Sequence, residues 1–191
     1  MQAEAFASPW WDRARYLDRQ PFLRSRAAVT KAVRAWFEAA GFTEVETAIL
    51  QISPGNETHL HAPMTELLGP DGARRTRYLR TSPEFAAKKL LAAGETRIFE
   101  LARVFRDRER VRTHLPEFTM LEWYRAGEGV SSVIADCTAL IALAAATTGI
   151  TQFSFRGRSA DPQADPQRLS VAEAFARFAG IDLPAGVSAD Q

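Results

Sequence analysis

Between Arg97 and Ala126 the sequence has two runs with the alternation of β-strands, separated by a loop rich in arginine. Side chains at every second position of a strand share one face. Residues 106–116 carry four arginines against two acids, and arginine binds phosphate oxygens bidentately. The pattern predicts a hairpin whose tip could hold a polyanion, with a solvated hairpin tip as the alternative. One face of the two strands would carry Glu100, Ala102, Val104, Arg106, Phe118, Met120, Glu122 and Tyr124.

This hairpin lies in a chain of ordinary globular composition. The 191 residues are 46% hydrophobic and 25% charged, which fits one domain, or one and a part, and excludes disordered and collagen-like classes. A net charge of +1 argues against a dedicated nucleic-acid coat. We find no signal-peptide pattern and no apolar run of about 18 residues, so we expect a cytoplasmic protein with no membrane span. Cys137, the single cysteine, lies in the apolar run 133–146 and is predicted to pack in a core.

Helical and strand-like segments together predict an α+β fold. Apolar residues at three- and four-residue steps predict a long amphipathic helix over 21–40 that ends at Gly41, after an N-terminal arm of residues 1–20. A strand is predicted over 42–50. Further along we predict a hairpin of 57–68 with 75–81, followed by a helix from Pro83 to about Ala93 that Ser82 caps. A buried helix over 133–146, capped by Ser131 or Ser132, is predicted next. The last predicted elements are an exposed loop over 157–167 and a helix that a Ser170–Glu173 capping box opens and that ends at Ala179.

The sequence gives little support to metal or covalent chemistry. His59 and His61 would point the same way from a strand, but no cysteine or third ligand lies near them. We find no Ser–His–Asp order and no glycine-rich phosphate loop. If ATP binds to this chain, the arginine-rich hairpin has to hold it.

Three segments resemble the class II aminoacyl-tRNA synthetases of the lysyl branch. Phe105-Arg106, the loop, His114 and the run EFTMLEWYR at 117–125 resemble motif 2, at about 97–126. The helix and strand of about 21–50 resemble motif 1, and TSPEF at 81–85 with KKLLAAG at 88–94 resembles the amino-acid-binding helix. More narrowly, the chain resembles the elongation factor P lysine ligases, which are paralogs of lysyl-tRNA synthetase. The resemblance implies an antiparallel sheet flanked by helices, with 21–191 forming part of a catalytic domain.

The resemblance also implies a role for each matched position. Arg106 would be catalytic, holding the α-phosphate of ATP and the amino-acid carboxylate while an adenylate forms. The ATP-binding residues would be Arg106, Asp107, Arg108, Arg112, His114 and Phe118, with Phe118 stacked on adenine. The lysine-binding residues would be Ser82, Pro83, Glu84, Glu100, Glu122 and Tyr124. ATP and Mg²⁺ are the implied cofactors, with no metal ligands expected within this chain.

Some positions depart from the family pattern. Ala48 stands where the motif 1 strand usually has proline, Arg108 where motif 2 has an acid, and Leu115 where asparagine is common. Nothing after Phe155 resembles motif 3 or the acidic magnesium-binding strand. We therefore expect an incomplete fold that corresponds to the N-terminal part of such an enzyme and is inactive by itself.

The implied activity is ATP-dependent activation of lysine or β-lysine and its transfer to a lysine of elongation factor P. The motif 1 helix implies a homodimer. One alternative is the catalytic core of a lysyl-tRNA synthetase; only about 20 residues precede the motif 1 helix, so we do not expect a tRNA-binding module or tRNA as partner. The other alternative is a non-catalytic paralog that binds a nucleotide or a protein partner.

Overall fold

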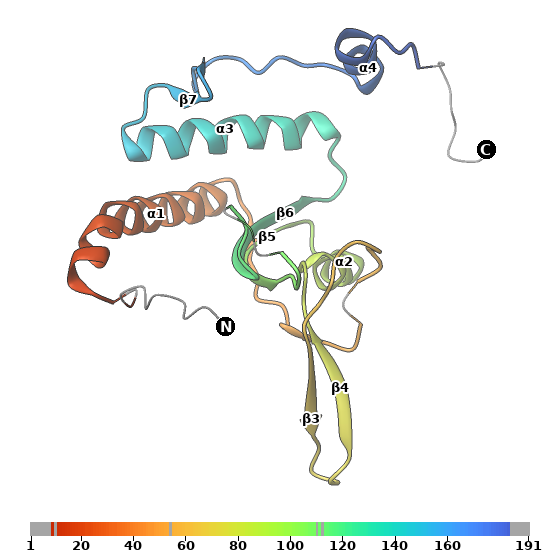
Figure 1. Cartoon of the computed structure of the whole chain (residues 1–191). Coiled ribbons are helices and arrows are strands. Elements are labelled where there is room, and N and C mark those ends of the chain that lie inside the picture. Colours follow the sequence, from red (N-terminus) through yellow and green to blue (C-terminus); the bar gives the residue numbers. More distant parts are fainter. Residues whose placement is uncertain (1–8, 10, 54, 110, 112, 184–191) are drawn as a thin grey trace. The chain divides into compact units, whose positions relative to one another are not determined.

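The computed structural model describes residues 9, 11–53, 55–109, 111 and 113–183. Contacts divide the chain into two units, Met1–Gly149 and Ile150–Gln191, and each is described by itself. The first unit contains two small sheets with helices, and the second a hairpin and a helix (Figure 1). The predicted mixture of helices and antiparallel strands is confirmed.

Helix α1 spans Arg13–Ala39 and passes through Pro21, so the prediction that a helix begins at Pro21 is wrong. It begins earlier because the Asp12 carboxylate accepts hydrogen bonds from the N–H groups of Ala14 and Arg15, at 3.1 and 3.2 Å. An internal proline removes one helical hydrogen bond without preventing the helix from starting upstream. The helix ends at Ala39 with Ala40 as its C-cap, within one residue of the predicted end, and Gly41 follows with a left-handed φ of 78°.

The arginine-rich hairpin is confirmed as strands β5, Arg97–Phe105, and β6, Glu117–Arg125. They pair antiparallel with Glu100 opposite Glu122 and Val104 opposite Phe118, so these residues share one face as the alternation predicts. Strand β1, Thr43–Glu44, adds parallel to β5.

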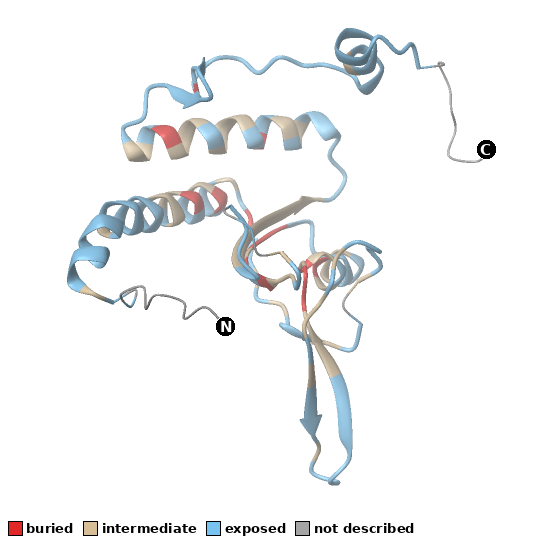
Figure 2. Ribbon diagram, viewed as in Figure 1, coloured by how far each residue is buried: buried red, intermediate tan, exposed pale blue. Residues whose placement is uncertain are grey.

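The second sheet has the order β2-β4-β3, from Leu50–Gln51, Arg74–Leu79 and Met64–Leu68. One continuous strand over 42–50 is therefore a wrong prediction, because the chain leaves the first sheet after β1 and joins the second at β2. Strands β3 and β4 form the predicted hairpin around the turn in which Gly72 N–H donates to the Gly69 carbonyl at 2.9 Å. This hairpin projects from the unit and is exposed along its outer part (Figures 1 and 2).

Helix α2 spans Glu84–Ala92, close to the predicted helix but one residue shorter at each end. Pro83 occupies the N-cap position with helical φ and ψ of −78° and −6°. The capping hydrogen bond nevertheless comes from Ser82, whose Oγ accepts from the Glu84 N–H at 3.1 Å. Ser82 is thus held at the start of α2, beside the sheet of β5 and β6.

The core of the first unit lies between α1 and the face of β5. Val33, Phe37, Phe42 and Phe99 form it, with the rings of Phe37 and Phe99 stacked at 4.5 Å between centroids. Buried residues gather here and where β4 meets α2 (Figure 2). Burying such aromatic side chains is the main source of stability for a small unit.

Helix α3, Val130–Thr148, lies beside α1 (Figure 1) but is not buried as predicted. Only Asp136 and Ala145 of its described residues are buried, and Ile141 is 50% exposed. Cys137 is exposed, so its predicted core position is wrong. No serine caps the helix; its N-cap is Gly129.

The prediction that no segment could span a membrane is also corrected. At 19 residues, α3 is long and apolar enough to cross a bilayer by length and composition alone, which is weak evidence because core helices meet the same criteria. Asp136 in its middle is paired with Arg125 on β6, at 2.7 Å. An ion pair to a neighbouring strand is typical of a helix that packs within a protein.

The second unit begins with strands β7, Phe153–Phe155, and β8, Arg158–Ala160. Arg156 and Gly157 both have positive φ, 49° and 75°, as a two-residue hairpin turn requires. The predicted loop over 157–167 therefore begins with a strand. Helix α4, Val171–Ala179, is confirmed with its Ser170–Glu173 capping box.

Candidate functional site

An acidic cluster forms where α2 begins beside strand β6. One oxygen of the Glu122 carboxylate accepts a hydrogen bond from the Ser82 hydroxyl at 2.5 Å, and the other accepts from the Tyr124 hydroxyl at 2.8 Å. Glu122 and Tyr124 reach the same face because they are two residues apart on a strand. The N-terminus of α2 brings Ser82 and Glu84 to that face. Four predicted lysine-binding residues are thus brought together.

The electrostatics of this cluster favour a cation. Burial raises the pKa of Tyr124 well above its usual value, and the hydrogen bond to Glu122 and the charges of nearby carboxylates raise it further. The phenol therefore remains a hydrogen-bond donor at neutral pH. Lys88 Nζ already lies 2.6 Å from a Glu84 oxygen, and this hydrogen bond raises the pKa of Lys88. A side chain that holds the ammonium of Lys88 can hold that of a substrate.

Two other predicted lysine-binding residues have different surroundings. Glu100 is 4% exposed, and its carboxylate is held by Arg80 at 2.6 Å and by the Thr47 hydroxyl at 2.7 Å. Pro83 is less than 2% exposed, so its side chain presents no surface to a ligand. A direct contact of Glu100 with substrate stays a prediction.

A cationic position lies at the end of β5. Arg106 Nε donates to the Thr81 carbonyl at 3.3 Å, and its guanidinium carbon lies 5.4 Å from the centre of the Phe118 ring. Arg106 is half-buried, which lets the guanidinium meet a ligand. A nucleotide presents phosphates and a flat base, and the neighbouring guanidinium and ring face fit both.

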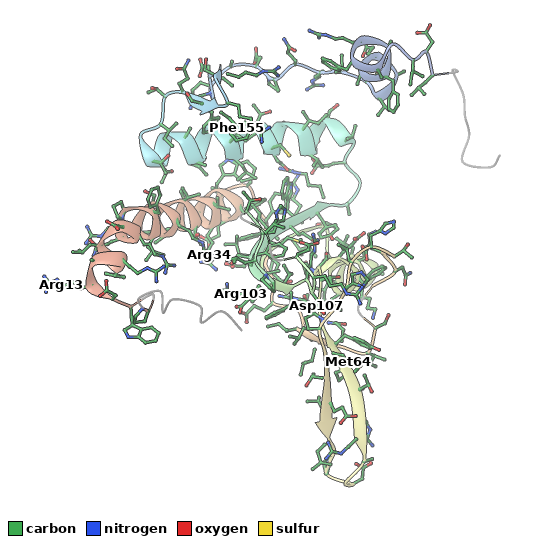
Figure 3. The ribbon with its side chains drawn as sticks, in the orientation of Figure 1. Arg13, Arg34, Met64, Arg103, Asp107 and Phe155 are labelled. Atoms are coloured by element: carbon green, nitrogen blue, oxygen red, sulfur yellow. The ribbon has the colours of Figure 1, made fainter. Side chains whose placement is uncertain are left out.

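The remaining predicted ATP-binding residues lie farther along the loop. Asp107 N–H donates to the His61 carbonyl at 2.7 Å, near the base of the β3–β4 hairpin (Figure 3). Arg108 has a left-handed φ of 65°, and its Nη1 lies 3.4 Å from His61 Nε2. His114 is exposed, with Nδ1 3.0 Å from the Thr113 hydroxyl. Arg112 lies outside the described residues. Binding of ATP phosphates by this loop stays a prediction.

Sequence reasoning missed three residues around the site. Arg80 and Thr47 surround Glu100, and Lys88 pairs with Glu84. The Lys88 pair has a visible signal, because acidic and basic residues four apart on a helix meet. Arg80 and Thr47 have none, since they come from segments that only the fold brings together. Among the described residues, no group of three His, Cys, Asp or Glu side chains could hold a metal ion.

Comparisons with known proteins agree on one family. The chain matches the family described as tRNA synthetases class II (D, K and N) over residues 5–186. It is 46% identical over 106 residues to the elongation factor P–(R)-β-lysine ligase of Vibrio vulnificus, covering 55% of this chain and 33% of that protein. It is 41% identical over 122 residues to the ligase of the same name from Vibrio cholerae, covering 63% of this chain and 38% of that protein. The chain spans about a third of the length of the curated relatives it matches.

Proposed function

Because the chain belongs to the class II tRNA synthetase family of the D, K and N type, we propose that it carries the amino-acid site of an ATP-dependent ligase. The substrate is lysine or β-lysine, which is activated as an adenylate and then transferred to a lysine of elongation factor P. The relatives at 41–46% identity are named elongation factor P–(R)-β-lysine ligases, which supports this acceptor. The chain spans about a third of the length of these relatives, and our proposal is that it is inactive by itself.

One observation carries the proposal: the segment Thr81–Ser82 joins a cationic position to an acidic one. Thr81 contacts Arg106 through its carbonyl, and Ser82 contacts Glu122 through its hydroxyl. An amino acid such as lysine has a carboxylate at one end and an ammonium on its side chain. Arg106 at one end of the segment can bind the carboxylate, and Glu122 at the other end can bind the ammonium.

In this proposal the residues act by positioning. Arg106 neutralises the carboxylate and the phosphate that it approaches, while Phe118 offers its ring face to the base. Glu122, Ser82 and Tyr124 orient the ammonium. The amino-acid carboxylate would attack the α-phosphorus of ATP and pyrophosphate would leave, and the later attack by the acceptor amine would release AMP, so no covalent nucleophile from the protein is needed. Mg²⁺ is proposed as a cofactor, and no step is assigned to it.

The proposal is tested by lysine-dependent exchange of pyrophosphate into ATP with the full-length gene product. Arg106→Ala should lower exchange about 100-fold or more, the usual loss for one charge-stabilising donor. Arg103→Ala is the matched control, because this exposed arginine of β5 (Figure 3) lies three residues away and pairs only loosely with Glu117, at 3.5 Å. It should change exchange by about two-fold at most. Equal losses would refute the role of Arg106.

The acceptor is tested by offering elongation factor P and lysine tRNA side by side. Labelled amino acid on elongation factor P supports the proposal, whereas charging of tRNA alone would make the protein a lysyl-tRNA synthetase. Absence of exchange in the full-length protein would favour the non-catalytic paralog. We place the activity in the cytoplasm.

A homodimer through α1 is part of the same proposal. Four large apolar side chains of this helix are between 40% and 76% exposed, which favours a partner surface. These are Tyr16, Leu17, Phe22 and Leu23. Light scattering should show a dimer that Phe22→Glu converts to a monomer; a wild-type monomer would exclude this interface.

A further inference from the structure

A buried ion-pair network adjoins the segment that joins the two ends of the site. Arg80 is 3% exposed, and its Nη2 lies 2.6 Å from a Glu100 oxygen. Nη1 donates to the Thr47 carbonyl at 2.9 Å and to the Thr47 hydroxyl at 2.6 Å. Nε donates to the Arg103 carbonyl at 2.9 Å. Every nitrogen of the guanidinium therefore has a partner.

The backbone of Arg80 is fixed as firmly as its side chain. Its N–H donates to the Ile49 carbonyl at 3.0 Å, and its carbonyl accepts from the Phe105 N–H at 2.9 Å. Arg80 directly follows β4, and these hydrogen bonds connect it to β5 of the first sheet. They also connect it to residues 47–49, which lead into β2 of the second sheet. Thr81 and Ser82 follow directly, so they start from a fixed point.

We propose that Arg80 is a positioning residue for amino-acid binding, which holds the Thr81 carbonyl against Arg106 and the Ser82 hydroxyl against Glu122. The proposal rests on the function proposed above. Because Arg80 is 3% exposed, its role in this proposal is to act through the two residues after it. Lysine could not replace Arg80 fully, because a single ammonium cannot reach the acceptors that the guanidinium fork meets.

Arg80 also compensates charge beneath the site. Glu100 lies directly opposite Glu122 in the register of β5 and β6, so the two carboxylates share one face. Like charges placed opposite each other destabilise a sheet. The guanidinium of Arg80 balances Glu100, which leaves Glu122 to accept hydrogen bonds from Ser82 and Tyr124. The network therefore sets both the place and the charge of the acidic cluster.

The first test is hydrogen exchange of the backbone amides of residues 80–82 and 84 in this chain, which does not depend on activity; Pro83 between them has no amide hydrogen. Arg80→Lys should raise their exchange about ten-fold, because the fixed point before the segment is loosened. Thr47→Val removes the hydroxyl that accepts from Arg80 and changes no charge. It should raise exchange at the same amides, and it serves as the test if Arg80→Lys does not fold. Arg77→Lys, on the same strand, should leave these amides unchanged. Unchanged protection in both Arg80→Lys and Thr47→Val would overturn the proposal.

The second test is a double-mutant cycle in the full-length gene product. Arg80→Lys alone should raise the KM for lysine about ten-fold with a smaller effect on kcat. If Arg80 acts through Ser82, the same change in a Ser82→Ala background should add less than about two-fold. Independent, multiplying effects would mean that Arg80 serves general stability, and would overturn the proposal. Absence of lysine-dependent exchange in the wild type would refute the proposed function, and the amide exchange would still decide the role of Arg80.

Discussion

Replacing Asp136 with alanine should destabilise the first unit by about 3 kcal/mol. Asp136 on α3 is 4% exposed and accepts hydrogen bonds from Trp123 Nε1 at 3.0 Å and from Arg125 Nε and Nη2 at 2.7 and 2.9 Å. Hydrogen bonding to Asp136 is the main cause that raises the pKa of Arg125. The substitution removes the polar link between α3 and β6.

The magnitude follows from what Arg125 keeps. Removing one partner of a buried ion pair costs about 3–5 kcal/mol, because the other charge is left unpaired. Arg125 retains Glu128 at 3.0 Å and lies 4.7 Å from the centre of the Phe42 ring, which places the cost at the lower end. Asp136→Asn keeps one acceptor oxygen, so it should cost about 1–2 kcal/mol. Ile141→Ser, at an exposed position of the same helix, should change stability by about 0.5 kcal/mol or less.

The assay is urea unfolding followed by tryptophan fluorescence, since Trp123 donates directly to Asp136 and reports its loss. The order of destabilisation should be alanine, then asparagine, then the Ile141 control. A cost below about 1 kcal/mol for Asp136→Ala, or an equal cost for Ile141→Ser, would show that this network does not attach α3 to the sheet.

Four further predictions concern the site and the second unit. In the full-length gene product, Glu122→Gln should raise the KM for lysine about ten-fold, because the amide loses the charge that attracts the ammonium; an unchanged KM would remove Glu122 from the site. Phe118→Ala should raise the KM for ATP and leave that for lysine within about two-fold, and equal changes in both would contradict base stacking. Ser170→Ala should reduce the helicity of residues 171–179, measured by Cα chemical shifts, because the capping box is lost; full helicity would show that the box is dispensable. The hydrogen bond from the Ser170 backbone N–H lowers the pKa of the Glu173 carboxyl below its usual 4.5. The stabilisation that Glu173 gives to helix α4 is therefore fully present above pH 4.5, and it is lost as the pH falls through the lowered pKa. Helicity that stays constant in acid would contradict this linkage.

Local patterns predicted the parts of the fold that depend on neighbouring residues. The face that Glu100 and Glu122 share follows from strand alternation, and the Ser170–Glu173 capping box follows from spacing alone. These features were predictable because the interactions that cause them are local. The matched motifs added the grouping of Ser82 with Glu122, which the structure contains.

The errors come from competition between signals and from contacts between distant segments. Proline is common at the first position of a helix, but the cap at Asp12 starts α1 earlier. The apolar composition of α3 predicts burial, yet burial depends on how many neighbours pack on a helix, and α1 and β6 contact only part of it. The ion pair between Arg80 and Glu100 joins two sheets, and no local pattern indicates it.

The most direct test of the central claim is the intact mass of elongation factor P after incubation with the full-length gene product, ATP and (R)-β-lysine. We expect the mass of elongation factor P to rise by one β-lysyl group, and to stay unchanged with the Arg106→Ala variant. Unmodified elongation factor P with the wild-type protein, under conditions in which lysine tRNA becomes charged, would contradict the proposed function.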